Sequence, residues 1–309
     1  MRERLRIAAA ASSALVVLTL TFTCAGCATT PARAAVGGKL RVVAAENSWG
    51  SIASALGGDR VTVDELINSP AIDPHDYEPT AADARAVATA RLVVVNGVGY
   101  DGWASKLLAA NPSSKRDVID VGALVGAASD GNPHRWYNPD DVRAVVGALT
   151  DAYSSADPTH ASYFAAQRVR YETDDLGRYD DLIAGIQAKY SGTAVGASES
   201  IFAMLAPALG LRLITPGSFL RAISEGADPT ASDKRVIDKQ IRDRDIKVYV
   251  YNAQNSTPDV RAQVNAAKSA GIPVVAITET PTPADISFTD WQIAQLMALQ
   301  TALGKGVSQ

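Results

Sequence analysis

Two short motifs contain two of the three histidines in this chain, and both have the composition of a turn that opens a helix. They are DPHDYEPT at residues 73–80 and NPHRWYNP at residues 132–139. Each motif places a histidine directly after a proline and two residues before an aromatic residue. Because neutral imidazoles held in turns are common metal ligands, His75 and His134 are candidate ligands of a divalent metal.

The elements that must position these histidines alternate between strand-like and helix-like segments. In the first part of the chain, apolar runs at 39–45, 61–66, 90–95 and 118–121 are separated by helical patterns, including 51–56 and 102–110. The alternation restarts with predicted strands at 194–197, 211–215, 247–251 and 273–277, and helices at 201–209, 232–244, 257–270 and 289–304. Such alternation indicates βαβ units and parallel sheets.

A long amphipathic segment lies between the two alternating regions. After Pro158 there is no proline until beyond Tyr190, and apolar residues recur every three or four positions, which predicts one long helix. Gly177 and Gly185 weaken it locally and predict a bend. The predicted fold is therefore α/β, with two βα lobes joined by one backbone helix and a ligand cleft between the lobes. The predicted limits are a signal peptide at 1–26, a tether at 27–38, an N-terminal lobe at 39–149, the linking helix at 150–191 and a C-terminal lobe at 192–309.

Ligands of open α/β sheets bind beyond the carboxyl ends of the strands, and four side chains are predicted to lie there. His75 and His134 follow strands of the N-terminal lobe, while Glu199 and Glu279 each lie two residues beyond a strand of the C-terminal lobe. Two ligands from each lobe would place a metal in the cleft. Each glutamate also has an ordinary interpretation: Glu199 could cap the helix predicted after it, and Glu279 could be a loop carboxylate.

The N-terminus is typical of an exported protein. Arg2, Arg4 and Arg6 precede an apolar run from residue 7 to about residue 22, which indicates a signal peptide. Ala25-Gly26-Cys27 resembles a bacterial lipobox, so Cys27 is the predicted lipidation site and the protein is expected on the outer face of the cytoplasmic membrane. An ordinary secretory peptide, or an uncleaved membrane anchor, is the alternative.

Charge and cysteine content exclude several classes of function. Removal of residues 1–26 takes away three arginines and one glutamate, and the formal net charge of −4 becomes −6. A mildly acidic chain without basic runs is a poor nucleic-acid binder. No cysteine follows Cys27, so disulfides and thiolate metal sites are excluded from the folded part.

The two histidine motifs, the long helix and the SESIF turn at residues 198–202 resemble the zinc/manganese-type metal-binding receptors of bacterial ABC importers. The likeness covers essentially the whole chain after the signal peptide. It implies a monomeric, lipid-anchored solute-binding protein without catalytic activity, which delivers metal to a membrane permease with its ATPase. It also implies four ligands, namely His75 and His134 and one residue at each of two later positions, to which Glu199 and Glu279 correspond.

The fourth ligand position departs from the family pattern. That position is usually aspartate, whereas the segment here offers Glu279, so Asp285 and Asp290 are alternatives. Of these, Asp290 is also suited to capping the helix that follows.

Two imidazoles and two carboxylates form a nitrogen and oxygen site that suits Mn²⁺ or Zn²⁺. The variable coordination of carboxylates favours manganese, with zinc next and iron after both. Zn²⁺ would bind such a site at least as tightly as Mn²⁺ by the Irving–Williams order, so affinity alone does not identify the cargo.

Two functions of other classes are alternatives. A secreted metal-dependent hydrolase would need an open coordination position and a nearby general base, and the sequence contains neither a His-Glu-x-x-His nor a Gly-x-Ser-x-Gly motif. A surface adhesin could be built on the same fold and would leave no local motif.

Overall fold

The computed structural model describes residues 38–72, 74, 77–255 and 257–308. The predicted signal peptide, the lipidation site Cys27 and the candidate ligand His75 lie outside the described residues. The elements packed around the first and second sheets are called the N-terminal and C-terminal lobes below. The limits of the two lobes remain predictions.

The first sheet is parallel throughout, with strand order β2-β1-β3-β4. Its strands are β1 Leu40–Glu46, β2 Val61–Ile67, β3 Leu92–Val95 and β4 Asp117–Asp120. The central strand β3 has the sequence LVVV and is buried along its whole length, as expected for a parallel strand covered on both faces. In the register, Val42 lies opposite Val63 on one side and Leu92 on the other.

The second sheet repeats this arrangement, with parallel strands in the order β6-β5-β7-β8. Its strands are β5 Ala194–Ala197, β6 Arg212–Leu213, β7 Tyr249–Asn252 and β8 Val274–Ile277. The carboxyl ends of β5 and β8 lead directly to Glu199 and Glu279. The predicted α/β class with two parallel sheets is confirmed.

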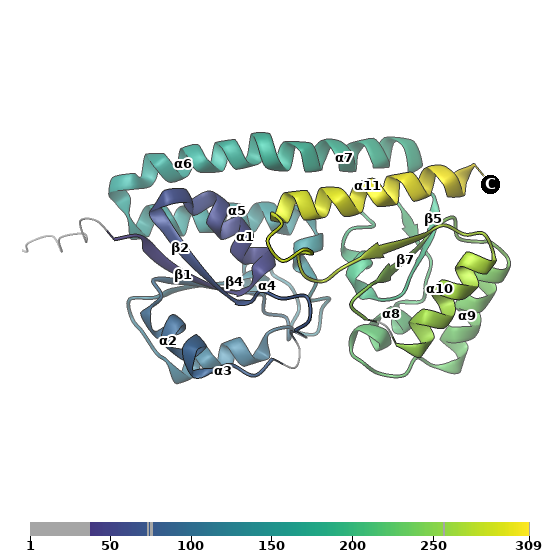
Figure 1. The fold of residues 1–309 in the computed structure, drawn as a ribbon, viewed down its shortest axis with the longest axis horizontal. Coiled ribbons are helices and arrows are strands. Elements are labelled where there is room, and N and C mark those ends of the chain that lie inside the picture. Colours follow the sequence, from purple (N-terminus) through teal and green to yellow (C-terminus); the bar gives the residue numbers. More distant parts are fainter. Residues whose placement is uncertain (1–37, 73, 75–76, 256, 309) are drawn as a thin grey trace, which may run out of the picture. The chain divides into compact units, whose positions relative to one another are not determined.

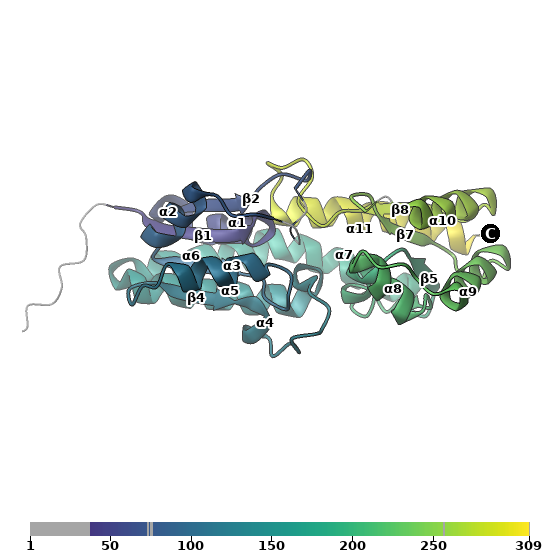
Figure 2. The same cartoon turned by 90° about the horizontal axis from the view of Figure 1, so that it is seen from below.

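Helices cover both faces of the first sheet (Figures 1 and 2). They are α1 Asn47–Gly57, α2 Ala81–Thr89, α3 Gly102–Ala110, α4 Val121–Leu124 and α5 Pro139–Ala156. Local sequence explains two of their starts. Thr80 and Asp83 form a capping box at the start of α2, and Asn138 caps α5, which has Pro139 in its first turn. Both helices begin beside the loops that carry the histidine motifs.

The C-terminal lobe contains α8 Gly217–Ser224, α9 Ala231–Arg242, α10 Pro258–Ser269 and α11 Phe288–Val307. The sequence did not indicate α8. The predicted helix at 201–209 was wrong, because only a short 3-10 helix, Ser200–Met204, forms there. Pro207 lacks the N–H that a further helical turn requires and disfavours helical geometry at the preceding residue.

The predicted long helix is confirmed and runs along both lobes (Figure 1). It consists of α6 Ala161–Arg170, a π-helical stretch Tyr171–Asp175 and α7 Leu176–Tyr190. The π-helical stretch is the irregularity in this helix, and it lies just before Gly177 rather than at Gly177 or Gly185. In a π turn the hydrogen bonds span five residues instead of four. Residues 150–156 belong to the end of α5.

One hydrophobic core continues from the first sheet to the second beneath the long helix. It includes Trp49 and Val94 of the N-terminal lobe, Tyr179 of α7, and Val195 and Leu299 of the C-terminal lobe. Separate clusters fill the opposite faces of the two sheets. The lobes are therefore joined along the side that carries α7 and α11, and the carboxyl ends of their strands meet away from that core. In the part of the chain that the structure describes, no helix is both long and apolar enough to cross a bilayer.

Candidate metal centre

Three of the four candidate ligands meet between the two sheets. His134 precedes the 3-10 helix Arg135–Tyr137 of the N-terminal lobe, whereas Glu199 and Glu279 follow β5 and β8 of the C-terminal lobe. The His134 Nε2 atom lies 3.6 Å from Glu279 Oε1. Glu199 is close enough for the charges of both other residues to act on its pKa.

The orientation of His134 is fixed by Asn132. The imidazole is 1% exposed, and its Nδ1 lies 2.8 Å from Asn132 Oδ1, which also accepts the backbone N–H of His134 at 3.1 Å. An amide oxygen only accepts hydrogen bonds, so Nδ1 carries the proton and Nε2 keeps its lone pair. Nε2 is buried and has no hydrogen-bond partner. This is the arrangement of a ligating histidine with an outer acceptor.

Glu199 points into the site instead of capping a helix. It precedes the 3-10 helix Ser200–Met204 but makes no capping hydrogen bond, which contradicts its ordinary interpretation. Its Oε2 accepts a hydrogen bond of 2.8 Å from Asn255 Nδ2, and its buried Oε1 has no hydrogen-bond partner. Burial, followed by the charge of Glu279, raises the pKa of Glu199 to about 7. A cation bound at Oε1 would remove this penalty.

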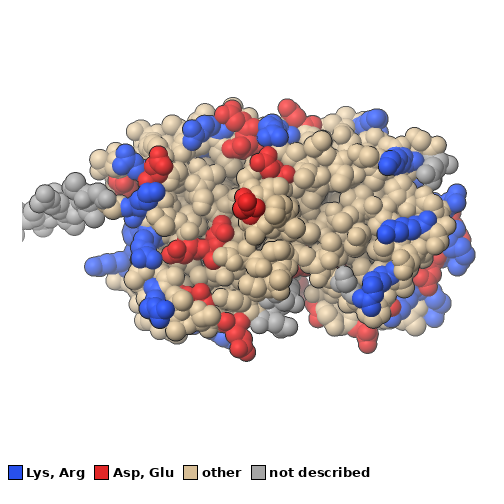
Figure 3. All heavy atoms as spheres, in the orientation of Figure 1, with Lys and Arg blue, Asp and Glu red and all other residues tan. Residues whose placement is uncertain are grey.

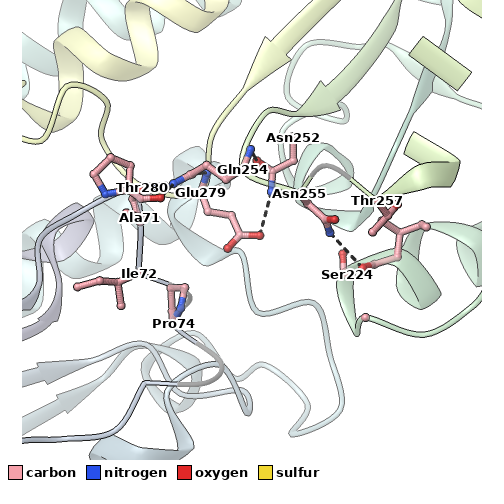
Figure 4. A pocket seen from close by; sticks show the side chains of 13 residues that line it. Ala71, Ile72, Pro74, Ser224, Asn252, Gln254, Asn255, Thr257, Glu279 and Thr280 are labelled. Atoms are coloured by element: carbon pink, nitrogen blue, oxygen red, sulfur yellow. Dashed lines mark hydrogen bonds between the residues drawn. The ribbon is translucent and has the colours of Figure 1, made fainter. Parts of the chain in front are cut away.

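Glu279 is held by groups from both lobes. Its Oε1 accepts from Asn252 Nδ2 at 3.1 Å, and its Oε2 accepts from the hydroxyl of Tyr100 in the N-terminal lobe at 3.3 Å. Its backbone N–H donates to Gln254 Oε1 at 2.6 Å. The side chain is 15% exposed. Its carboxylate is thus already ordered in the pocket (Figure 4).

The two alternative residues for the fourth position lie elsewhere. Asp285 is exposed in the loop before α11. Asp290 lies in the first turn of α11, where it pairs with the N-cap Ser287, and its Oδ1 lies 3.5 Å from Arg178. The sequence assigned the capping role to Asp290, but the N-cap is Ser287, whose hydroxyl accepts the backbone N–H of Asp290.

The donor atoms fit a divalent cation. The lone pairs of His134 Nε2 and Glu199 Oε1 are removed from water without a compensating hydrogen bond, which is costly. Imidazole nitrogen and carboxylate oxygen are ligands for Mn²⁺, Fe²⁺ and Zn²⁺. Among the described residues, no group of three or more His, Cys, Asp or Glu side chains is arranged so that it could hold a metal ion, so His134, Glu199 and Glu279 alone do not form a metal site. His75, the other candidate, is outside the described residues.

A pocket of about 430 Å³ leads to Glu279. Amide and hydroxyl side chains of the C-terminal lobe line one side, and the loop from Pro70 to Pro74 lines the other (Figure 4). No lysine or arginine is among the lining residues. Among the described residues, the pocket therefore reaches the carboxylate of Glu279 without a positively charged side chain in its lining.

Several residues that shape the site were not found from the sequence. They are Tyr100, Asn132, Asn252, Gln254 and Asn255. Asn252 is the last residue of β7, and Gln254 and Asn255 lie in the loop after it. The rule that ligands lie beyond strand ends could therefore have indicated these three residues. Asn132 lies two residues before His134, which was its only signal.

The two aromatic residues of the histidine motifs have different roles. Trp136 is buried, and its ring centroid lies 5.5 Å from that of His134, so it forms an apolar wall of the site. Tyr77 instead packs on Trp103 at 4.8 Å and donates its hydroxyl to Asp83. Trp136 thus lies against the site, whereas Tyr77 makes packing contacts within its lobe.

Another pair of carboxyl groups, Glu46 and Asp101, is buried near the carboxyl ends of β1 and β3. Glu46 and Asp101 are each 1% exposed, and Asp101 accepts the backbone N–H groups of Asn96 and Gly97 at 2.7 and 2.8 Å. Burial, then the charge of Asp101, raises the pKa of Glu46 well above its ordinary value, and both carboxyl oxygens of Glu46 are buried without a hydrogen-bond partner. The folded protein therefore favours the protonated form of Glu46.

This pair predicts a dependence of stability on pH. The folded state holds the Glu46 proton more tightly than the unfolded chain, whose glutamate pKa is about 4.3, so the free energy of unfolding falls as pH rises above that value. Glu46→Gln keeps the shape of the side chain and removes the ionisable proton. We expect this variant to exceed the wild type by about 1–3 kcal/mol at pH 8 and by less at pH 5.

Denaturant unfolding of both proteins at the two pH values measures this difference. Glu225→Gln, at an exposed carboxyl group, is the matched control and should follow the wild type. A gap between Glu46→Gln and wild type that stays constant from pH 5 to pH 8 would show that the Glu46 proton does not control stability.

Comparisons with known proteins agree with this arrangement. The family described as zinc-uptake complex component A, periplasmic (ZnuA), matches residues 42–302. The manganese ABC transporter substrate-binding lipoprotein PsaA of Streptococcus mitis is 25% identical over 81% of this chain and 83% of the relative. The iron ABC transporter substrate-binding lipoprotein MtsA of Streptococcus pyogenes serotype M1 is 23% identical over 82% of this chain and 84% of the relative.

Solved structures share the fold. A Mn-bound periplasmic metal binding protein from Candidatus Liberibacter asiaticus has a TM-score of 0.71 and 20% sequence identity, and the match covers 86% of this chain and 100% of that one. The resemblance inferred from the histidine motifs is therefore supported by both sequence and fold.

Proposed function

Because this chain belongs to the ZnuA family of metal-binding, solute-binding lipoproteins of ABC transporters, we propose that it captures a divalent transition metal outside the cytoplasm and delivers it to an import permease. The family consists of solute-binding proteins and not of enzymes, so the hydrolase alternative is set aside. His75, His134, Glu199 and Glu279 are the proposed ligands, and the metal is cargo rather than a resident cofactor.

The observation that carries the proposal is a pair of atoms in the cleft that could each bind a metal and that make no hydrogen bond. His134 Nε2 and Glu199 Oε1 are both buried without a hydrogen-bond partner, while Asn132 and Asn255 hold the other ends of the same side chains. Buried polar atoms are nearly always hydrogen bonded. Two of the exceptions, His134 Nε2 and Glu199 Oε1, come from different lobes and lie beside the carboxylate of Glu279, and a cation that binds to all three side chains would account for them.

Manganese is the proposed cargo, followed by zinc and then iron. Glu199 and Glu279 supply hard oxygen ligands whose coordination can expand beyond four, which suits Mn²⁺ more than it suits tetrahedral Zn²⁺. The relatives differ on this point, because one is named for manganese and another for iron. The ligand chemistry, rather than the relatives, supports the order.

The place of action follows from the N-terminus and from the relatives, which are named lipoproteins. Lipidation at Cys27 would hold the protein at the outer face of the cytoplasmic membrane, beside its permease. The charged side chains are compatible with this role and not with nucleic-acid binding. On the face shown in Figure 3, lysine and arginine are interspersed with aspartate and glutamate over both lobes and form no continuous basic band.

Calorimetric titration of metal-stripped protein with Mn²⁺ and then Zn²⁺ tests the function. We expect one metal to bind per chain, with Zn²⁺ at least as tight as Mn²⁺ because of the Irving–Williams order. Binding of Mn²⁺ supports manganese as cargo, whereas binding of Zn²⁺ alone would assign the protein to zinc import. If neither metal binds, the protein is not a metal receptor.

A further inference from the structure

Two amide side chains cross between the lobes at the site. Asn132 Nδ2 donates to the backbone carbonyl of Ser200, next to Glu199, at 2.6 Å. Gln254 Nε2 donates to the carbonyl of Pro70, in the loop that leads to His75, at 2.8 Å. The first bond connects the segment of His134 in the N-terminal lobe to the segment of Glu199 in the C-terminal lobe. The second connects the loop that leads to His75 to Gln254, which holds Glu279.

The opposite end of each amide holds a proposed ligand. Asn132 Oδ1 accepts from both Nδ1 and the backbone N–H of His134. Gln254 Oε1 accepts the backbone N–H groups of Glu279 and Thr280, at 2.6 and 3.1 Å. The oxygen of each amide thus positions a ligand within its own lobe, while its nitrogen bonds across the cleft.

The Gln254 side chain is fully used. Its Nε2 also donates to Thr280 Oγ1 at 2.8 Å, and its backbone N–H donates to Asn252 Oδ1 at 2.9 Å. Asn252 in turn holds the Glu279 carboxylate. Figure 4 shows Gln254 between Asn252 on one side and Thr280 and Ala71, from two different loops, on the other. A rotation of this side chain would release Pro70 and the Glu279 backbone together.

Other hydrogen bonds join the lobes without touching a proposed ligand in this way. The Tyr137 hydroxyl donates to the Thr278 carbonyl, and the Phe288 N–H donates to Ser51 Oγ. Both are associated with α11: Phe288 begins this helix, and the Tyr137 ring packs on Trp291 within it. These bonds can persist when the cleft opens away from the shared core.

We infer that Asn132 and Gln254 are paired latches, which couple closure of the two lobes to the positioning of His134 and Glu279, so that metal leaves only after these bonds break. The inference rests on the proposed metal-binding function and adds the residues that control release. It makes both amides positioning residues, because neither side chain supplies a donor atom to the metal. A permease that separates the lobes slightly would break both bonds and loosen two ligands at once.

Acid variants of the two amides separate the latch from electrostatics. Asn132→Asp and Gln254→Glu keep the shape and an accepting oxygen, so the ligand can still be held, but they lose the donor that crosses the cleft. The added negative charge would by itself slow release of a cation. Loss of one latch is therefore expected to speed release despite that charge, by about three- to tenfold for each variant.

The experiment loads each protein with Zn²⁺, mixes it with an excess of a chromophoric chelator, and records the release rate by stopped flow. Asn111→Asp is the matched control, because Asn111 Nδ2 donates to the Leu107 carbonyl within the N-terminal lobe, and its release rate should equal that of the wild type. The unfolding midpoints of the metal-free variants should also stay near the wild-type value, since a merely structural role would lower them.

Faster release from both acid variants, with wild-type behaviour of the control, supports the latches. Release from Asn132→Asp and Gln254→Glu that is as slow as, or slower than, that of wild type overturns the inference and leaves the receptor function intact. Failure of the wild type itself to bind Zn²⁺ and Mn²⁺ would overturn the proposed function, and the latch inference with it.

Discussion

Glu199→Gln is expected to bind Mn²⁺ and Zn²⁺ at least about 100-fold more weakly than the wild type, since loss of residues outside the ligand shell already costs 10- to 100-fold. The substitution keeps the volume of the side chain and an oxygen to accept from Asn255. It removes the negative charge and directs a neutral amide at the cation. Calorimetry or competition with a chelator of known affinity measures the loss.

The same variant should not destabilise the metal-free protein. Burial holds the pKa of Glu199 at about 7, so above that pH the metal-free wild type carries the cost of a buried charge that glutamine lacks. We expect an unfolding midpoint at pH 8 that equals or exceeds the wild-type midpoint. Glu172→Gln, on the long helix, is the control and should bind metal normally. Weak binding accompanied by a lowered midpoint would indicate that Glu199 has a structural role and is not a ligand.

The sequence predicted those parts of the fold that depend on local patterns. The alternation of strands and helices identified both sheets, because the apolar runs of the strands and the periodicity of the helices are contained within short stretches of sequence. The prediction of a helix at 201–209 was wrong because it relied on the apolar periodicity of the segment and gave too little weight to Pro207. The short helix α8, Gly217–Ser224, was missed although Phe219, Leu220 and Ile223 have the spacing of one helical face, because a segment of eight residues gives only a short periodic pattern.

The site was predictable to the extent that ligands follow strand ends. That rule nominated His134, Glu199 and Glu279, which the fold brings near one another, and it also nominated His75. The role of all four as ligands remains a prediction. It could not identify the hydrogen-bond partners of these residues. Gln254 and Pro70 are separated by 184 residues, and no local pattern relates them. Nor could the sequence decide whether Glu199 caps a helix, because that choice depends on Asn255 from another loop.

Substitution of the proposed fourth ligand, Glu279, is the second change expected to have a large effect on metal affinity. Glu279→Ala is expected to lower the affinity for Mn²⁺ by about 100-fold or more, whereas Asp285→Ala and Asp290→Ala should change it by less than about threefold. Glu279 lies 3.6 Å from His134 Nε2, while Asp285 is exposed and Asp290 is bonded to Ser287 and Arg178. Titration of the three variants beside the wild type makes the comparison.

Glu279→Asp distinguishes a ligand from a nearby charge. Aspartate retains the charge but is one methylene shorter, so it cannot keep the hydrogen bonds from Asn252 and Tyr100 and also reach the same cation position. If Glu279 acts only through its long-range charge, the aspartate variant should bind like the wild type. If it is a ligand held by those two donors, the variant should lose about tenfold or more in affinity, as expected when the outer hydrogen bonds of a metal ligand are removed. A large loss in Asp285→Ala combined with none in Glu279→Ala would reassign the fourth position, and would require the loop before α11 to fold into the cleft when metal binds.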